Sequence, residues 1–170
     1  KILVTGGVGF VGTNLIKRLL KEGHEVISID NYSTGNVENE QEGCTYYEMD
    51  IKDLYVDGEY EDPNVPILSQ VDVIFHIAAI ARIQPSFDNP KNYFTVNANG
   101  TMNIVEWCSK NNVPLIYAGS SSKHSGRFKN PYTFSKDLGE DIITLYQTHF
   151  NLISTTARFY NVYGPHQLTE

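Results

Sequence analysis

The residues best suited to chemistry are a tyrosine and a lysine four positions apart, Tyr132 and Lys136. Residues at this spacing lie on one face of a helix. A tyrosine normally titrates at about pH 10, so it serves as a base at neutral pH only where a nearby positive charge stabilises its phenolate. Lys136 supplies such a charge, and a hydroxyl from the serine cluster at 120–122 could bridge a substrate oxygen and the phenolate. These groups suit removal of a proton from a secondary alcohol while a hydride leaves for a nicotinamide. The alternative is a surface Tyr/Lys pair without a chemical role.

The first dozen residues predict a binding site for the dinucleotide that would accept this hydride. Residues 2–4 are a short apolar run, and apolar residues recur at helical spacing from position 10 to position 20. Between them stand the glycines of a tight turn, Gly6, Gly7, Gly9 and Gly12. A strand, a glycine turn and a helix in this order direct backbone N–H groups at a pyrophosphate. The alternative is a glycine turn that only packs a helix against a strand.

An acidic residue, Asp30, ends the next apolar run. In a dinucleotide site this carboxylate accepts hydrogen bonds from the adenosine ribose hydroxyls and repels a 2′-phosphate. Since no arginine follows closely, the sequence favours NAD over NADP. The alternative is a simple turn aspartate. After a third strand, Asp50 and Ile51 are placed to meet the edge and the face of an adenine.

The alternation of strands and helices predicts an α/β fold with a doubly wound parallel sheet. Expected helices follow the glycine turn and cover 88–111 and 131–150, while 52–66 is irregular; expected strands cover 2–4, 25–29, 44–49, 71–77, 114–118 and 153–159. Gly100 in the second helix suggests a close approach of that helix to the sheet. His76 is interpreted as a packed residue at a strand end. The serine cluster follows a strand at its carboxyl end, where open parallel sheets hold their chemistry.

Composition narrows the class of protein. The chain has 170 residues, enough for one domain, 1–170, with a real core, and its net charge is −7. Nucleic acids and anionic membranes require basic surfaces, so neither is expected as a partner, and no apolar run approaches the roughly 20 residues of a membrane span. Cys44 and Cys108 lack metal-ligand spacing, so no metal site is expected, and reduced thiols suit a cytoplasmic protein. The chain starts inside a strand without Met, which suggests a fragment of a longer protein.

Eight motifs in family order give the chain a resemblance to the extended short-chain dehydrogenase/reductases that act on nucleotide sugars, most closely the UDP-glucose or UDP-N-acetylglucosamine 4-epimerase type. They are Thr5-Gly-Gly-Val-Gly-Phe-Val-Gly12, Asp30-Asn-Tyr-Ser-Thr-Gly35, Asp50-Ile51, His76-Ile-Ala-Ala79, Asn97-Ala-Asn-Gly-Thr101, Ser120-Ser-Ser122, Pro131-Tyr-Thr-Phe-Ser-Lys136 and Arg158-Phe-Tyr-Asn-Val-Tyr-Gly-Pro165. The resemblance implies a Rossmann-like NAD-binding domain, a nucleotide-sugar substrate such as a UDP-hexose, and a homodimer formed by the two long helices. It also implies that a C-terminal substrate domain is absent from this chain.

The same resemblance assigns roles to individual residues. It implies that Tyr132 is the catalytic base, that Lys136 holds the nicotinamide ribose and that Ser121, counted back from Gly126, is the catalytic serine. The cofactor-binding residues would be Gly6, Gly9, Phe10, Val11, Gly12, Asp30, Asn31, Ser33, Thr34, Gly35, Asp50, Ile51, Ile77, Ala78, Ala79, Ala81, Asn97, Tyr132, Lys136 and Tyr160. The substrate-binding residues would be Arg82, Ser86, Ser121 and Asn161.

The chain departs from the family pattern after the serine cluster. Family members usually carry Val-Tyr-Gly there, whereas this chain has His124-Ser-Gly126 and a shorter loop before the Tyr/Lys helix, which leaves the choice within 120–122 open. Related dehydratases place an Asp-Glu pair after the serine or threonine, and decarboxylating relatives carry a glutamate in this region; neither is present. The expected reaction is therefore epimerisation through a transient keto-sugar, with a reductase or dehydratase as alternatives. A non-catalytic NAD-binding module or an inactive fragment is the alternative of another class.

Overall fold

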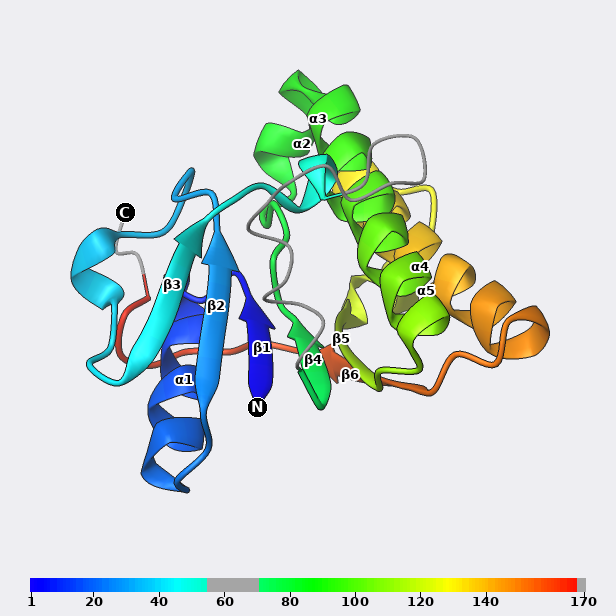
Figure 1. Cartoon of the computed structure of the whole chain (residues 1–170). Coiled ribbons are helices and arrows are strands. Elements are labelled where there is room, and N and C mark those ends of the chain that lie inside the picture. The colour runs from blue at the N-terminus through cyan, green and yellow to red at the C-terminus, as the bar shows by residue number, and fades with distance from the viewer. Residues whose placement is uncertain (55–70, 168–170) are drawn as a thin grey trace.

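The computed structural model describes residues 1–54 and 71–167. Six parallel strands form one sheet in the order β3-β2-β1-β4-β5-β6 (Figure 1). They are β1 (Ile2–Thr5), β2 (Val26–Asp30), β3 (Cys44–Glu48), β4 (Val73–His76), β5 (Leu115–Ser120) and β6 (Ser154–Phe159). The prediction of a doubly wound parallel α/β fold is confirmed. The predicted irregular segment 52–66 lies outside the described residues from position 55 onward.

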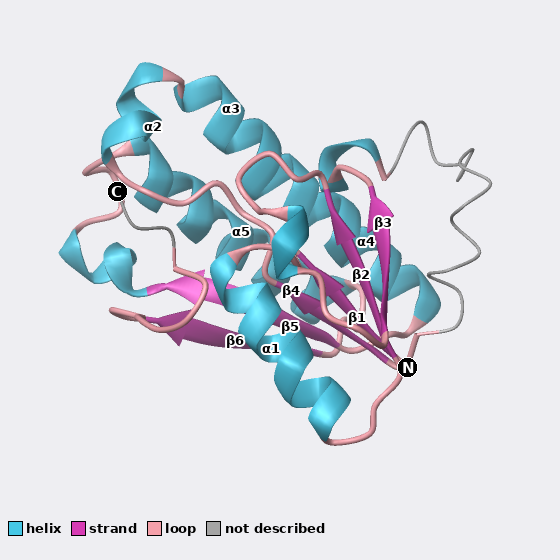
Figure 2. Cartoon of the chain, turned by 90° about the vertical axis from the view of Figure 1, so that its left-hand side faces the viewer, coloured by secondary structure: helices cyan, strands magenta, loops and turns pink. Residues whose placement is uncertain are grey.

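Both faces of the sheet are covered, which explains the unbroken apolar runs of its central strands. All four residues of β1 are buried. Successive side chains of a strand point to opposite faces, so Ile2 and Val4 join the cluster under α1 (Phe10–Lys21), while Leu3 packs with residues of α4 (Thr101–Asn111) and α5 (Pro131–His149). Figure 2 shows α1 on one side of the strands and α4 and α5 on the other. The sheet is therefore a rigid middle layer whose strand ends can hold a site.

Several short helices complete the chain. The connection after β4 contains α2 (Gln84–Asp88) and α3 (Pro90–Phe94), and single 3₁₀ turns cover η1 (Val37–Asn39), η2 (Ile51–Asp53) and η5 (Ser121–Ser125). The sequence pattern predicted neither α2 nor these turns. Within the described residues, none of the helices combines the length and the apolar character that a membrane crossing needs.

The predicted single helix over 88–111 is wrong in its start and its regularity. Asp88 ends α2, the side chain of Asn89 caps α3 by accepting from the Asn92 amide, and a π-helical segment, η4 (Thr95–Gly100), separates α3 from α4. π-Helical turns within α-helices are frequent at functional sites. The reason suggested for Gly100 also needs correction: a Cβ there would lie 2.7 Å from Cδ1 of Ile51, so its neighbour is η2 and not the sheet.

The order in which strands are added to the sheet reverses between β1 and β4. The chain leaves β1 toward β2 and β3 on one side, and returns through β4 to build the other side. In open parallel sheets, the crevice at the carboxyl ends of such strands is where ligands bind. The fold thus brings the β1–α1 turn, the end of β4 and the end of β5 to one edge.

Candidate active site

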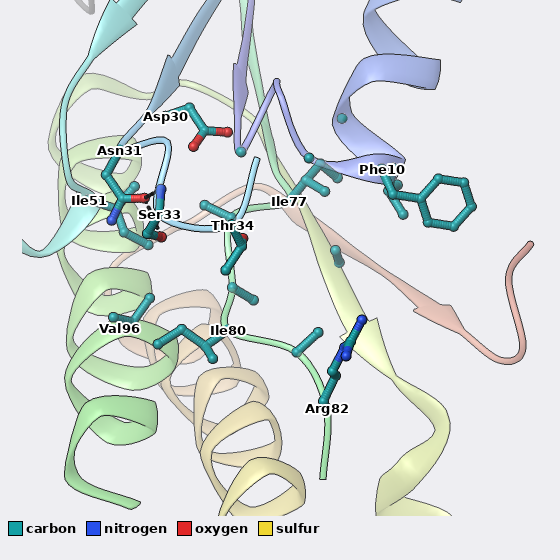
Figure 3. Close-up of a pocket in the computed structure, with 18 of the residues that line it drawn as sticks. Phe10, Asp30, Asn31, Ser33, Thr34, Ile51, Ile77, Ile80, Arg82 and Val96 are labelled. Carbon is teal, nitrogen blue, oxygen red and sulfur yellow. Dashed lines mark hydrogen bonds between the residues drawn. The ribbon is translucent and has the colours of Figure 1, made fainter. Parts of the chain in front are cut away.

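A cavity of about 950 Å³ lies at this edge of the sheet. Its walls come from the glycine turn before α1, the ends of β2, β4 and β5, and the first turns of α5. Figure 3 shows Asp30, Asn31 and Ser33 gathered at one end and Arg82 on the opposite side. Most residues predicted to contact the cofactor line it, namely Gly6, Gly9, Phe10, Val11, Gly12, Asp30, Asn31, Ser33, Thr34, Asp50, Ile51, Ile77, Ala78, Ala79, Ala81, Tyr132, Lys136 and Tyr160.

The glycine turn is packed too tightly for side chains. Gly6 has a φ of +75°, a conformation that favours glycine. A Cβ on Gly12 would lie 2.1 Å from the carbonyl oxygen of Gly6, so the helix approaches the strand only because this residue has none. Gly9 is the N-cap of α1, and no side chain caps the first turn. The amides of that turn therefore face the cavity edge with the polarity that binds phosphate.

Asp30 ends β2 at the far wall of the cavity. Its Oδ2 accepts a hydrogen bond from the Val8 amide at 3.1 Å, and its Oδ1 accepts one from the Tyr32 amide at 2.9 Å. Burial raises the pKa of Asp30 above its ordinary value, and these backbone hydrogen bonds act in the opposite direction. Each carboxylate oxygen accepts more than one hydrogen bond, so the geometry leaves Asp30 able to accept ribose hydroxyls.

Asp50 lines the same end of the cavity but is already engaged. Its Oδ2 accepts hydrogen bonds from Nδ2 of Asn31 and Nζ of Lys52, both at 2.8 Å. Burial alone would raise the pKa of Asp50, but these contacts outweigh it and lower the pKa. Ile51 is 4 % exposed, and its backbone is held by Asn103. The pair predicted to meet an adenine is therefore held in place by its own neighbours.

A buried hydrogen-bond chain fixes the floor of the cavity beneath the end of β4. The amides of Ile77 and Ala78 donate to Oγ1 of Thr5, which lies 2.7 Å from Nδ1 of His76. Nε2 of His76 lies 3.0 Å from Oγ1 of Thr101, whose proton goes to a backbone carbonyl. The histidine is therefore neutral with its proton on Nε2. Burial lowers its pKa to about 3, and Lys136 contributes in the same direction. As predicted, His76 is a packed strand-end residue.

Asn97 positions the loop that follows β4. Its side chain lies in the π-helical segment, is fully buried, and does not line the cavity. Its Oδ1 accepts from the Ile80 amide at 2.8 Å, while its Nδ2 donates to the Ile80 carbonyl at 3.0 Å and to Oγ of Ser135 at 3.1 Å. Asn97 thus ties the cavity loop to α5 without reaching the cavity itself.

The groups predicted for catalysis meet at the other end of the cavity. The hydroxyl of Tyr132, at the start of α5, lies 3.4 Å from Oγ of Ser120, at the end of β5. Lys136, one turn further along α5, is 4 % exposed, and its Nζ lies 4.2 Å from the ring centroid of Tyr117. Burial lowers the pKa of Lys136 to about 7, with Glu140 opposing this effect. The cavity therefore brings together a phenol, an aliphatic hydroxyl and an amine that titrates near neutrality.

The sequence prediction chose Ser121, but the structure brings Ser120 to Tyr132. Ser121 does not line the cavity. It begins the 3₁₀ turn η5, for which Ser120 is the N-cap, and Oγ of Ser120 donates to Oγ of Ser122 at 2.9 Å. Counting back from Gly126 crosses this turn, in a stretch where the chain departs from the family pattern. Counting forward along the apolar run of β5 ends at Ser120.

Two buried acids on α5 hold the segments beside Ser120. Oε2 of Glu140 lies 2.6 Å from Nζ of Lys123 and 2.7 Å from Nη2 of Arg158. Asp137 lies 3.0 Å from the same lysine and 3.2 Å from Nη1 of Arg127. Burial alone would raise the pKa of Glu140, but its hydrogen bonds to Arg158 and Lys123 outweigh this effect and lower the pKa. Lys123 directly precedes the stretch where this chain departs from the family pattern, and its ammonium ties the start of that stretch to the Tyr/Lys helix.

Four further predicted residues lie outside the cavity lining: Gly35, Ser86, Asn97 and Asn161. A Cβ on Gly35 would lie 2.5 Å from Cγ2 of Val8, so this glycine serves packing. Ser86 is fully buried and its hydroxyl donates to the Ile83 carbonyl, while Asn161 is exposed. Arg82 lines the cavity as predicted.

Sequence reasoning missed several lining residues, some inside the predicted motifs or next to predicted residues and others from distant segments: Val8, Ile80, Asn39, Tyr93, Val96 and His166. The C-terminal part of the described chain folds back over α1, where Asn14 donates to the Pro165 carbonyl at 2.8 Å. His166 lies 2.6 Å from Nζ of Lys17 and 2.8 Å from Oδ1 of Asn39. No sequence pattern indicates these contacts, because more than 120 positions separate the partners.

Comparison with known proteins agrees with this geometry. Residues 2–170 match the model of the NAD dependent epimerase/dehydratase family. A putative UDP-glucose 4-epimerase of Methanocaldococcus jannaschii is 31% identical over 180 residues, with 98% of this chain and 57% of the relative covered. UDP-glucuronate 4-epimerase 2 of Arabidopsis thaliana is 32% identical, with 96% and 42% covered.

Solved structures give the same result. UDP-glucose 4-epimerase of Thermotoga maritima, determined with UDP-glucose, matches with a TM-score of 0.87 at 29% identity, covering 98% of this chain and 57% of that one. The Thermus thermophilus UDP-glucose 4-epimerase in complex with NAD matches with a TM-score of 0.84 at 30% identity, again over 98% and 57%. The chain therefore spans little more than half the length of these relatives.

Proposed function

Because the chain belongs to the NAD-dependent epimerase/dehydratase family, we propose that its cavity binds NAD and serves the epimerisation of a nucleotide sugar, with a UDP-hexose as the substrate. The single observation that carries the reaction is the contact of Tyr132 with Ser120 beside the buried Lys136, in the same cavity as the glycine turn.

The residues present fit NAD. The glycine turn offers the unoccupied amides of a helix start, and no Cβ stands between Gly12 and Gly6. Asp30 accepts hydrogen bonds at the opposite end, where a ribose would place its hydroxyls, and its negative charge disfavours the 2′-phosphate of NADP. Relatives include an epimerase solved with NAD. We therefore propose that the adenosine half lies toward Asp30 and the nicotinamide half toward Tyr132.

The chain's own groups would then move the proton. When bound, NAD supplies a hydride acceptor for the carbon that carries the reacting hydroxyl. Tyr132 takes the proton of that hydroxyl, and Ser120 holds the substrate oxygen by a hydrogen bond. Lys136, the positive group nearest along α5, stabilises the phenolate and binds the nicotinamide ribose. Asn97 keeps the loop after β4 in place against α5.

The charges of the cavity favour epimerisation over elimination. Among the described residues that line it, the acids are Asp30 and Asp50, both at the adenosine end. The acids nearest the serine segment, Asp137 and Glu140, are ion-paired and do not line the cavity. Proton removal for a dehydration would require an additional acid or base at the reacting end. Return of the hydride to the other face of a keto-sugar requires none beyond Tyr132.

We propose a UDP-hexose as substrate, a homodimer as the assembly and the cytoplasm as the location. Relatives named for UDP-glucose and for UDP-glucuronate both match the chain, and one relative was solved with UDP-glucose, so a UDP-hexose is the class that we propose. Arg82 and Tyr160 line the cavity, and we assign Arg82 to the sugar end and Tyr160 to the nicotinamide. A homodimer through α4 and α5 and a cytoplasmic location remain predictions, the first testable by light scattering.

The proposal is tested by assaying the purified chain for bound NAD and for conversion of UDP-hexoses. We expect NAD to be bound and the Tyr132→Phe variant to keep NAD while losing conversion. A Phe94→Tyr variant of α3, outside the cavity lining, serves as a control for expression and folding. Full conversion by Tyr132→Phe would refute the mechanism. NAD binding with no conversion by the unchanged chain would instead support a non-catalytic NAD-binding module.

A further inference from the structure

Arg82 adopts a backbone conformation that side chains normally avoid. Its φ is +83°, the largest positive value among the non-glycine residues of the described ranges 1–54 and 71–167. Two other residues with positive φ, Asn112 and Asn151, are asparagines, which tolerate this conformation because their short polar side chains can hydrogen-bond locally. The long side chain of arginine has no such compensation. Residues in strained backbone conformations persist where several surrounding contacts hold them in place, and they are frequent at ligand sites.

The surroundings of Arg82 hold it on both sides. The hydroxyl of Tyr93, a residue of α3 that is 3 % exposed, lies 2.9 Å from the carbonyl oxygen of Ala81 and 3.0 Å from that of Arg82. Two residues earlier, the side chain of Asn97 binds both the amide and the carbonyl of Ile80. The strain is therefore built into a fixed loop.

This loop places a cation at the reacting end of the cavity. Tyr93 contacts Tyr132 edge to face, with ring centroids 6.3 Å apart, so the segment that holds Arg82 also borders the phenol. The guanidinium stands on the cavity wall on the side away from Asp30 and Asn31 (Figure 3). The cavity thus carries acids at one end, Asp30 and Asp50, and the cations Arg82 and Lys136 toward the other.

We propose that Arg82 determines specificity by binding anionic oxygens of the substrate, which makes the preferred substrate a nucleotide sugar with an anion within reach of the loop. The inference rests on the proposed function. A guanidinium offers a planar fork of N–H donors that matches a phosphate or a carboxylate. The anion is either the diphosphate of the nucleotide or a carboxylate on the sugar, as in a uronic acid. The loop strain is tolerated because it aims this fork into the cavity.

The test is calorimetric titration of the NAD-loaded 170-residue chain with UDP, UDP-glucose and UDP-glucuronate, comparing the unchanged chain with Arg82→Gly. Glycine removes the charge and accepts the positive φ. We expect the melting temperature and NAD affinity of Arg82→Gly to be retained, and nucleotide affinity to fall at least roughly tenfold, the scale of one charge-assisted hydrogen bond. Equal losses for all three ligands identify the diphosphate. A loss confined to UDP-glucuronate identifies the sugar carboxylate.

The matched control is Asn112→Gly, which offers the same relief at a positive φ of 55° in the C-cap of α4, outside the cavity lining. It should leave all affinities unchanged. The proposal is overturned if Arg82→Gly binds the three nucleotides as the unchanged chain does, if it loses NAD affinity to the same extent, or if the NAD-loaded chain binds none of them. A chain that fails to bind NAD at all would instead refute the proposed function.

Discussion

Replacing Lys136 by methionine should stabilise the folded chain near neutral pH and lose this advantage in alkali. The ammonium is 4 % exposed within the cavity wall, and its burial lowers the pKa from its ordinary value of 10.5 to about 7. Below pH 7 the folded and unfolded chains both carry the proton, and the folded state bears the full cost of a buried charge. Between pH 7 and 10.5 the unfolded state binds more protons, so stability rises with pH. Above pH 10.5 the lysine is neutral in both states, so it no longer destabilises the folded chain.

The size of this effect follows from the two pKa values. At about 1.4 kcal/mol for each pKa unit, the fall corresponds to about 5 kcal/mol of unfolding free energy at pH 6. This figure is a net value, because any favourable contact of the ammonium, such as that of Nζ with the Tyr117 ring at 4.2 Å from the centroid, is already part of the pKa difference. Lys136→Met should therefore be more stable than the unchanged chain by up to about 5 kcal/mol at pH 6. This difference should disappear by about pH 10.5.

Urea unfolding followed by circular dichroism from pH 6 to pH 10 measures the difference. The control is Lys91→Met, because Lys91 is an exposed lysine of α3; its stability relative to the unchanged chain should not depend on pH. A stability difference for Lys136→Met that stays constant across this range would refute the assignment of a buried, destabilised ammonium. A variant that is less stable than the unchanged chain at pH 6 would refute it as well.

Two further substitutions test the packing of the glycine turn and the ion pairs on α5. Gly12→Ala should lower the unfolding free energy by about 3 kcal/mol in urea titrations, because its Cβ would lie 2.1 Å from the Gly6 carbonyl oxygen. Gly9→Ala, whose Cβ would lie 3.4 Å from the same atom, should lower it by only about 1 kcal/mol. Equal losses of stability in the two variants would contradict the packing argument. Glu140→Gln should cost about 2 kcal/mol by the same measurement, below the 3–5 kcal/mol of a fully buried pair because Arg158 is 42% exposed. The control is the more exposed ion pair of Asp141 with Arg127, since Asp141→Asn should lower the unfolding free energy by under about 1 kcal/mol. A Glu140→Gln variant as stable as Asp141→Asn would refute the stabilising role of the Glu140 carboxylate.

The central strands and the glycine turn could be predicted from sequence because their causes are local. β1 is a continuous apolar run buried on both faces, and the turn that follows needs glycine for steric reasons which a spacing pattern records. Asp30 was predicted from its place at the end of β2, and the structure puts it on the cavity wall.

Other features depended on contacts that sequence does not record. The π-helical segment reflects a residue, Asn97, whose side chain bonds to Ile80 and Ser135 from other parts of the chain. The serine facing Tyr132 depends on where β5 ends and on the 3₁₀ turn that follows, and a count made from Gly126 records neither. The resemblance implies Arg82 as a substrate-binding residue, but no sequence pattern indicates its positive φ or the contact of its carbonyl with the hydroxyl of Tyr93.

The most direct test of the account is a calorimetric titration of the chain with NAD, with Asp30→Ala beside it and Asp88→Ala, an exposed acid of α2, as the control. We expect one NAD site per chain and an unchanged affinity for Asp88→Ala. The affinity of Asp30→Ala should be at least roughly tenfold lower, because the hydrogen bonds of Asp30 to the ribose are lost. Circular dichroism confirms that both variants are folded. A chain that does not bind NAD, or a folded Asp30→Ala variant that binds it as tightly as the unchanged chain, would contradict the assignment of this cavity to the cofactor.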